Sequence, residues 1–461
     1  MKCLASLIVI LGACSDDAPA KTVAELQDPN TCKECHPKHF EDWSMSMHAY
    51  ASDDPVFVAM NKRGQRDTNN ALGTFCVQCH APMAVALGTT TGIDFDPTQL
   101  PPTERGITCY FCHNVAAIAD THNNGLQIAL DQTMRGGIRN PVGNATHHAR
   151  FDATMDSVTN DSAMCGSCHD VVSPAGIHLE RTYEEWKGTI FTDPDPRRHL
   201  SCGGCHMQPF DDVVADDPTV NVPFRTGGRH DHSFAAIDQA MTPFPGQDKL
   251  AVKVAAILDP VAVIISPKKG TVPAPGGICV SPGSTFTVRI DNIGAGHAFP
   301  SGAGQDRRVW LEVQAYDTGN AVVFASGVVP ADQDPPPVAT ANFAGFWDTT
   351  HAGDGSPAHF FWDVATEESM LMKPAVTLDA NDPRFDHSTT TTYGVPSTAV
   401  IDRIEVKVHV RPFPYMMLDE LIASGDLDPS IRTKVPTLDP VGATSTWTRA
   451  TADAVSGCNP F

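Results

Sequence analysis

Five copies of the pattern Cys-x-x-Cys-His lie in the first half of the chain, and they restrict its fold more than any other feature. Covalent attachment of a porphyrin needs this arrangement, because two thiols about one helical turn apart add to its two vinyl groups. The imidazole that follows then lies under the iron and binds it. The pattern predicts five c-type haems, held at Cys32–His36, Cys76–His80, Cys109–His113, Cys165–His169 and Cys202–His206.

Structural zinc is the alternative interpretation of paired cysteines. Zinc sites combine two Cys-x-x-Cys pairs about 15–20 residues apart and need no histidine after the second cysteine. Here the pairs are farther apart, their number is odd and each is followed by histidine, so we interpret the chain as a multihaem cytochrome c. The predicted haem-attaching residues are Cys32, Cys35, Cys76, Cys79, Cys109, Cys112, Cys165, Cys168, Cys202 and Cys205, and the predicted proximal iron ligands are His36, His80, His113, His169 and His206.

The N-terminus has the features of an export signal. One positive charge at Lys2 precedes a short apolar run, and Leu11–Cys14 resembles the bacterial lipobox, in which the cysteine is acylated. We expect residues 1–14 to be a lipoprotein signal peptide, and Cys14 to anchor the protein in the outer membrane, facing the periplasm or the cell surface. A soluble signal peptide cleaved nearby is the alternative. Both predict export, in agreement with the haem motifs.

Two of the 14 cysteines, Cys279 and Cys458, belong neither to a haem motif nor to the signal region. Because exported proteins fold where disulfides persist, we expect these two to pair. Two free buried thiols are the alternative.

The formal net charge of -22 argues against nucleic acid and anionic membrane surfaces as binding partners. Membrane contact is therefore expected only through the anchor at Cys14. The acidic surface would attract basic redox partner proteins, or it serves only to keep the protein soluble. The sequence does not fix the oligomeric state.

The chain is long enough for about two or three domains. Residues 15–28 are polar and are expected to be a tether. Residues 29–245 contain every haem motif and many Gly, Pro, Asn and Asp residues, so we predict a mainly irregular, short-helix multihaem cytochrome domain. Period-two alternation, as in Ile404–Val410, predicts an antiparallel β-sandwich over residues 250–461, with a long insertion at about 330–400.

The second axial ligand of each iron decides whether a haem only passes electrons or offers an open coordination site. On this point, residues 30–235 resemble the cytochrome c554 family of multihaem cytochromes. The segments that carry the resemblance are Cys32–His36 with Trp43–Ala49, Cys79–Pro82, Gly106–Cys109, Cys165–Asp170, Tyr183–Trp186, Cys205–Met207 and Asp231–Phe234. The resemblance implies stacked haems with mostly bis-histidine ligation.

The same resemblance implies which histidines are distal ligands. They are His48 in the Trp-x-x-Ser-x-His segment, His232, and one of His147 and His148, which the sequence does not distinguish. The glycine-rich segment 292–302 resembles a β-domain that follows the haem domain in many exported multihaem cytochromes. Its glycines let the backbone approach a flat group, so we interpret His297 as a distal ligand; a turn histidine bonded to the backbone is the alternative.

These observations favour an electron carrier between a membrane or periplasmic donor and a terminal acceptor, and they leave catalysis open. The first alternative is an enzyme that reduces or oxidises a small nitrogen or sulfur compound at one open haem. The lack of the Cys-x-x-Cys-Lys motif used by nitrite reductases argues against it. The second alternative is a subunit of an extracellular cytochrome filament. No catalytic residue is assigned.

Overall fold

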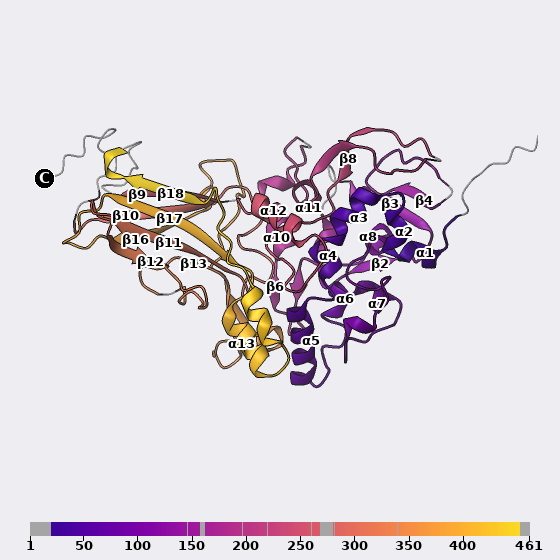
Figure 1. Cartoon of the computed structure of the whole chain (residues 1–461), viewed down its shortest axis with the longest axis horizontal. Helices are drawn as coiled ribbons and strands as arrows, with labels where there is room; N and C mark the ends of the chain where they lie inside the picture. Colours follow the sequence, from indigo (N-terminus) through magenta and orange to yellow (C-terminus); the bar gives the residue numbers. More distant parts are fainter. Residues whose placement is uncertain are drawn as a thin grey trace, which may run out of the picture.

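The computed structural model describes residues 20–144, 146–156, 162–195, 197–218, 220–259, 261–267, 280, 282–338 and 340–451. A motif-bearing part built of short helices lies beside a β-rich part formed by the C-terminal half (Figure 1). Cys14, Cys279 and Cys458 lie outside the described residues, so the lipid anchor and the disulfide stay predictions.

Short helices and small sheets make up the motif-bearing part, as the sequence predicts. The helices are α1 Val23–Gln27, α2 Pro29–Lys33, α3 Pro37–Ser44, α4 Met47–Tyr50, α5 Pro55–Asp67, α6 Val77–His80, α7 Pro82–Ala86, η1 Pro97–Gln99, α8 Cys109–His113, η2 Ala153–Met155, α9 Ala163–Gly166, α10 Thr182–Lys187, η3 Ile190–Thr192, α11 Cys202–His206 and α12 Gln247–Ile257. The strands pair as β1 Val115–Ile118 with β2 Leu126–Ile128, β3 Thr133–Gly136 with β4 His148–Phe151, β5 Val171–Val172 with β6 His178–Glu180, and β7 Pro209–Asp212 with β8 Arg225–His230. The β3–β4 pair is parallel and the others are antiparallel.

The β-rich part contains two larger antiparallel sheets. One has the order β16-β10-β9, and the other has the order β12-β11-β17-β18, with β13 also paired to β11. The elements are β9 Val261–Pro267, β10 Thr285–Asn292, β11 Arg308–Tyr316, β12 Val322–Ser326, β13 Gly345–Phe346, β14 Thr349–His351, η4 Phe361–Asp363, β15 Thr366–Glu368, β16 Ser388–Gly394, β17 Arg403–Arg411, α13 Tyr415–Ala423, η5 Pro429–Lys434 and β18 Thr444–Thr448. Residues 388–394, which the sequence analysis placed in the insertion, form β16 and pair with β10 along its whole length.

The apolar core is distributed unevenly. One large cluster joins buried side chains of both larger sheets, among them Val288 of β10 and Leu311 of β11. The motif-bearing part has only small described clusters, such as Ala81, Ala84 and Leu100. A part of this length without a large side-chain core needs another apolar body inside it, and attached porphyrins would supply one.

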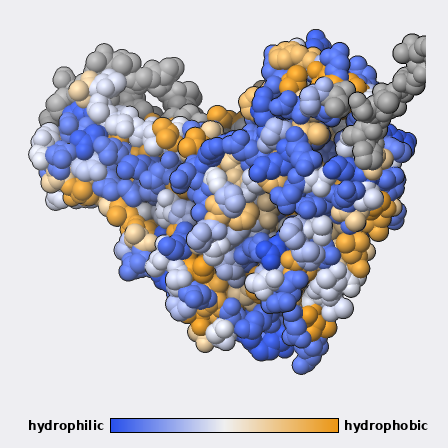
Figure 2. Space-filling model, turned by 45° about the vertical axis from the view of Figure 1, so that its right-hand side comes forward, coloured by the Kyte–Doolittle hydropathy of each residue, from blue (hydrophilic) through white to orange (hydrophobic). Residues whose placement is uncertain are grey.

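The two parts are packed against each other. α5 and α13 lie side by side (Figure 1), and Ala59 and Met60 of α5 share a cluster with Leu418 and Leu421 of α13. Within the described ranges, no helix has both the length and the apolar character needed to cross a bilayer. Hydrophilic residues prevail on the face drawn in Figure 2, where hydrophobic residues form separate groups.

Candidate multihaem site

Each motif forms a single helical turn. α8 and α11 begin at Cys109 and Cys202, because the side chains of Thr108 and Ser201 accept hydrogen bonds from backbone N–H groups of the first turn. In the other three motifs, the histidine N–H donates to the carbonyl oxygen of the first cysteine, at 2.8 Å in the first motif, 3.4 Å in the second and 3.0 Å in the fourth. Residues three apart on such a turn lie on one face, so each pair of thiols can reach one porphyrin.

Four of the five proximal histidines are oriented by the backbone. A carbonyl oxygen only accepts, so Nδ1 must carry the hydrogen, which leaves the lone pair of Nε2 free for a metal. The Nδ1-to-oxygen distances are 2.7 Å for His36 to Val214, 3.1 Å for His80 to Ala51, 2.5 Å for His113 to Arg135 and 2.9 Å for His206 to Ala235.

Four proximal histidines each face a second imidazole. The distances between ring centres are 6.3 Å for His36 and His147, 6.3 Å for His113 and His232, 6.1 Å for His169 and His48, and 6.5 Å for His206 and His297. Metal–nitrogen bonds of about 2 Å, together with the size of the ring, put two axial imidazole centres roughly 6 to 6.5 Å apart. These four pairs therefore fit one haem iron each.

The facing histidines are largely enclosed but not fully buried, and their surroundings favour the neutral form that an iron ligand needs. Burial lowers the pKa of His48 to about 3, and it lowers the pKa of His147, His232 and His297 to about 4. His232 and His297 also donate through Nδ1 to backbone carbonyl oxygens, at 2.8 and 2.7 Å. His297 thus makes the backbone bond of the turn interpretation through Nδ1, which leaves Nε2 free while its ring faces that of His206.

The structure separates two histidines that the sequence left equivalent. His147 faces His36, whereas His148 begins strand β4 and is exposed. Neighbouring residues of an extended chain point in opposite directions, so only one of them can face the motif.

The loop that carries His297 is fixed to the motif-bearing part by Glu185. One carboxylate oxygen of Glu185 in α10 accepts from the backbone N–H of Ala298 at 3.1 Å and from the hydroxyl of Ser301 at 2.7 Å. Gly296 has φ of +70° and lies against Phe191, where a Cβ would meet the ring at 3.3 Å. A β-rich part thereby delivers an imidazole to the fifth motif.

The second motif differs from the others. The ring of His80 stacks on Phe57 at 4.0 Å with the planes only 3° apart, and no described histidine faces His80 as a distal ligand would. Burial lowers the pKa of His80 to about 4, so this imidazole is also neutral.

Cysteines of different motifs lie near one another. Thiols of different motifs interact between Cys32 and Cys109, Cys79 and Cys168, Cys165 and Cys202, and Cys112 and Cys168. The first motif therefore adjoins the third, the third adjoins the fourth, and the fourth adjoins both the second and the fifth.

Comparison with known proteins agrees with this geometry. The family model described as cytochrome c554 and c-prime matches residues 31–114, which contain the first three motifs. This segment of the chain is therefore similar to the multihaem c-type cytochromes of that family. The fold of the chain is similar to the crystal structure of a penta-heme cytochrome c552 from Thermochromatium tepidum, with a TM-score of 0.60, 16% identity, and coverage of 93% of this chain and 100% of that chain. No curated protein matches the chain.

One further histidine beside the motifs was not predicted from the sequence. The ring centre of His39 lies 5.7 Å from that of His36 and 5.0 Å from that of His232, between the first and third motifs. Burial lowers the pKa of His39 to about 2. Its position three residues after His36, one turn along α3, was the available signal.

Proposed function

We propose that this cytochrome carries electrons along five covalently bound haems c. The proximity of cysteines from successive motifs supports this proposal, because porphyrins attached to neighbouring cysteines have edges close together. Bound haem supplies a one-electron couple whose potential its axial ligands set. The polypeptide fixes the order in which the haems would exchange electrons. Electrons would pass from the first motif to the third, the fourth and then the fifth, and the second motif would branch from the fourth.

We assign the distal ligands from the facing pairs. His147 serves the first motif, His232 the third, His48 the fourth and His297 the fifth. The separation of the ring centres supports each assignment. His148 is left without a ligand role because it is exposed.

The number of haems and their connection are tested together. The intact mass of the purified protein should exceed that of the polypeptide by five haems, one for each motif. Titration with a reductant should then take up five electrons per chain, and stopped-flow reduction should show no haem isolated from the rest. A lower haem count, or a haem that is reduced only far more slowly than the others, would contradict a continuous path.

We further propose that the protein works outside the cytoplasm, attached to the outer membrane through Cys14 and exchanging electrons with basic redox proteins. The family and the export signal support the location. The net charge of -22 supports the choice of partner.

Reaction with a small ligand at the second motif is the second candidate function. It is favoured by one observation, the pairing of His80 with Phe57 instead of another imidazole. An iron bound by His80 alone would keep one axial position open for a small nitrogen or sulfur compound.

The oxidised protein should then give a high-spin electron paramagnetic resonance signal from one haem in five, and the reduced protein should bind one carbon monoxide per chain. Purely low-spin signals and no carbon monoxide binding would remove this candidate and leave electron transfer untouched.

A further inference from the structure

Helix α10 is hydrogen-bonded to two of the haem motifs. The backbone N–H of Tyr183 donates to the carbonyl oxygen of His169 at 3.3 Å, and the indole N–H of Trp186 donates to the carbonyl oxygen of Leu200 at 2.9 Å. His169 ends the fourth motif, and Leu200 lies just before the fifth. The ring of Tyr183 also lies against Gly166, where a Cβ would meet it at 2.4 Å. α10 therefore has a fixed position relative to both motifs.

The same helix holds the loop of the proposed distal ligand of the fifth motif. Oε2 of Glu185 accepts from the backbone N–H of Ala298 at 3.1 Å and from the hydroxyl of Ser301 at 2.7 Å. The hydroxyl of Thr182 accepts from the backbone N–H of Gly302 at 3.0 Å. Because Ser301 gives its only hydroxyl hydrogen to Glu185, Thr182 must donate to Ser301 across their 2.7 Å contact. These hydrogen bonds therefore end on Glu185, whose carboxylate accepts.

The internal shape of this loop has a different origin. Asn292 at the end of β10 donates from its side-chain amide to the carbonyl oxygen of His297 at 2.7 Å, and its amide oxygen accepts from the N–H of Ala295 at 3.1 Å. Both bonds lie within the β-rich part. They set the shape of the loop around His297, whereas the contacts with α10 set the distance of the loop from the fifth motif.

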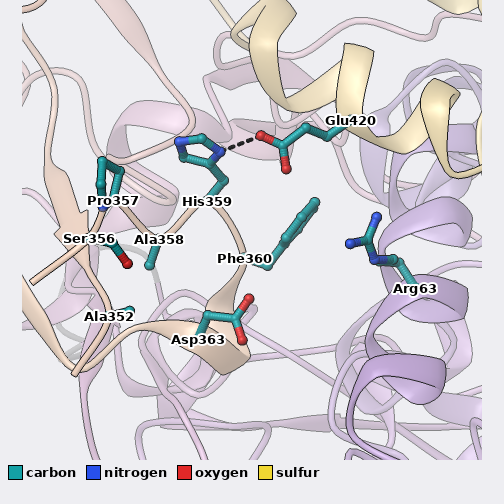
Figure 3. A pocket seen from close by; sticks show the side chains of 9 residues that line it. All are labelled: Arg63, Ala352, Ser356, Pro357, Ala358, His359, Phe360, Asp363 and Glu420. Carbon is teal, nitrogen blue, oxygen red and sulfur yellow. Dashed lines mark hydrogen bonds and ion pairs between the residues drawn. The ribbon is translucent and has the colours of Figure 1, made fainter. Parts of the chain in front are cut away.

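The other contact between the two parts, that of α13 with α5, contains a cavity. The cavity has a volume of about 330 Å³ and lies between α5, α13 and the segment before η4 (Figure 3). Nδ1 of His359 lies 2.5 Å from Oε1 of Glu420 at its wall, and both residues belong to the β-rich part. Glu420 is thus a hydrogen-bonded glutamate at the same boundary, bound to a residue of its own part and not to the loop of His297.

We propose that Glu185 is the positioning residue that keeps His297 in place as an axial ligand of the fifth haem. Its two hydrogen bonds hold the loop so that the ring of His297 faces that of His206, with 6.5 Å between the ring centres. The inference rests on the proposed function, because it needs a haem at the fifth motif. It adds a residue of α10 that controls the coordination of this haem without binding the iron.

Spectroscopy of the purified, haem-loaded Glu185→Ala protein tests this role. Without their acceptor, the N–H of Ala298 and the hydroxyl of Ser301 are left unpaired, so the loop should move away from the fifth motif. One haem should then change from low spin to high spin, and the reduced variant should bind one more carbon monoxide per chain than the native protein. Added imidazole should restore the low-spin spectrum. Glu185→Gln should stay low-spin, because its amide oxygen can accept the same two hydrogen bonds.

Two further variants separate positioning from a general loosening of the boundary. Glu420→Ala is the matched control, since it also removes a hydrogen-bonded glutamate where the two parts meet, and it should leave the spin states and the carbon monoxide stoichiometry unchanged. Ser301→Ala keeps Glu185 and removes one of its two donors. It should cause a smaller change of the same kind as Glu185→Ala, and it serves as the test if Glu185→Ala does not fold.

The outcomes distinguish this inference from the proposed function. A Glu185→Ala protein that stays low-spin and binds no additional carbon monoxide overturns the positioning role, as does a Ser301→Ala protein identical to the native one. A Glu185→Gln or Glu420→Ala protein as high-spin as Glu185→Ala overturns it as well. If His297→Ala becomes high-spin while Glu185→Ala does not, only the positioning role fails and the ligand assignment stands. In each case reduction of the haems would still report electron transfer independently.

Discussion

Replacing His297 by alanine is expected to leave every haem attached and to convert one haem from low spin to high spin. Attachment depends on Cys202, Cys205 and His206, which stay in place, whereas the imidazole 6.5 Å from His206 is lost. Axial ligands set haem potentials over a range of about 0.8 V, so we expect the affected potential to rise by on the order of 0.1 V. The reduced variant should bind one more carbon monoxide per chain than the native protein, measured by spectroscopic titration.

A second histidine of the β-rich part provides the control. His351 in β14 is half-buried, like His297, but faces no haem motif histidine among the described ring contacts. His351→Ala should therefore leave the spectra and the carbon monoxide stoichiometry unchanged. If His297→Ala stays fully low-spin and binds no additional carbon monoxide, His297 is only a turn residue and the β-rich part has no share in the site.

The haem motifs were predictable because their chemistry is local. Two cysteines and a histidine within five residues specify attachment without any knowledge of the fold. The choice between His147 and His148 as the distal ligand, in contrast, depends on the fold. It depends on where β4 begins and on its parallel pairing with β3, which brings Thr133 beside His148. Long-range pairing of this type leaves no periodic signal in so short a strand.

In the β-rich part too, some strands were predictable from local sequence, whereas others depend on pairing with a distant strand. β17 was predictable because its apolar residues alternate, and its buried side chains confirm the pattern. β16 was missed because its sequence is Ser-Thr-Thr-Thr-Thr-Tyr-Gly, which lacks that alternation. It becomes a strand because the backbone of β10 pairs with it at every residue. It is a mostly exposed edge strand, so it needs few apolar residues.

The contact between Phe57 and His80 could not be predicted from any sequence pattern. Phe57 reaches His80 because α5 begins at Pro55, four residues after Ala51, whose carbonyl oxygen accepts from Nδ1 of His80. That arrangement distinguishes the second motif from the other four motifs, which share the Cys-x-x-Cys-His pattern. The identity of the axial neighbours is therefore a tertiary property, even where the sequence alone predicts the proximal ligand.

His48 lies where the contacts between the motifs converge. Its ring centre is 6.1 Å from that of His169 and 4.4 Å from that of Phe234. Its low pKa results first from burial and then from the imidazoles around it, which belong to His169, His206, His232 and His80. The backbone holds it there, since the carbonyl oxygen of His48 accepts from the N–H of Ile107 at 2.9 Å. In the proposed order of haems, every route between the first and fifth motifs passes this position.

His48→Ala should therefore slow electron passage more than the loss of any other distal histidine. Loss of the imidazole raises the potential at the fourth motif, and a rise of about 0.12 V would hold an electron about 100-fold more tightly there. Stopped-flow oxidation of the reduced protein should then show the last electron leaving about 100-fold more slowly. His148→Ala removes an exposed histidine and should change neither spectrum nor rate. A His48→Ala protein that releases all its electrons at the native rate would show that the fourth motif is not the crossing point, and the order derived from the cysteine contacts would be wrong.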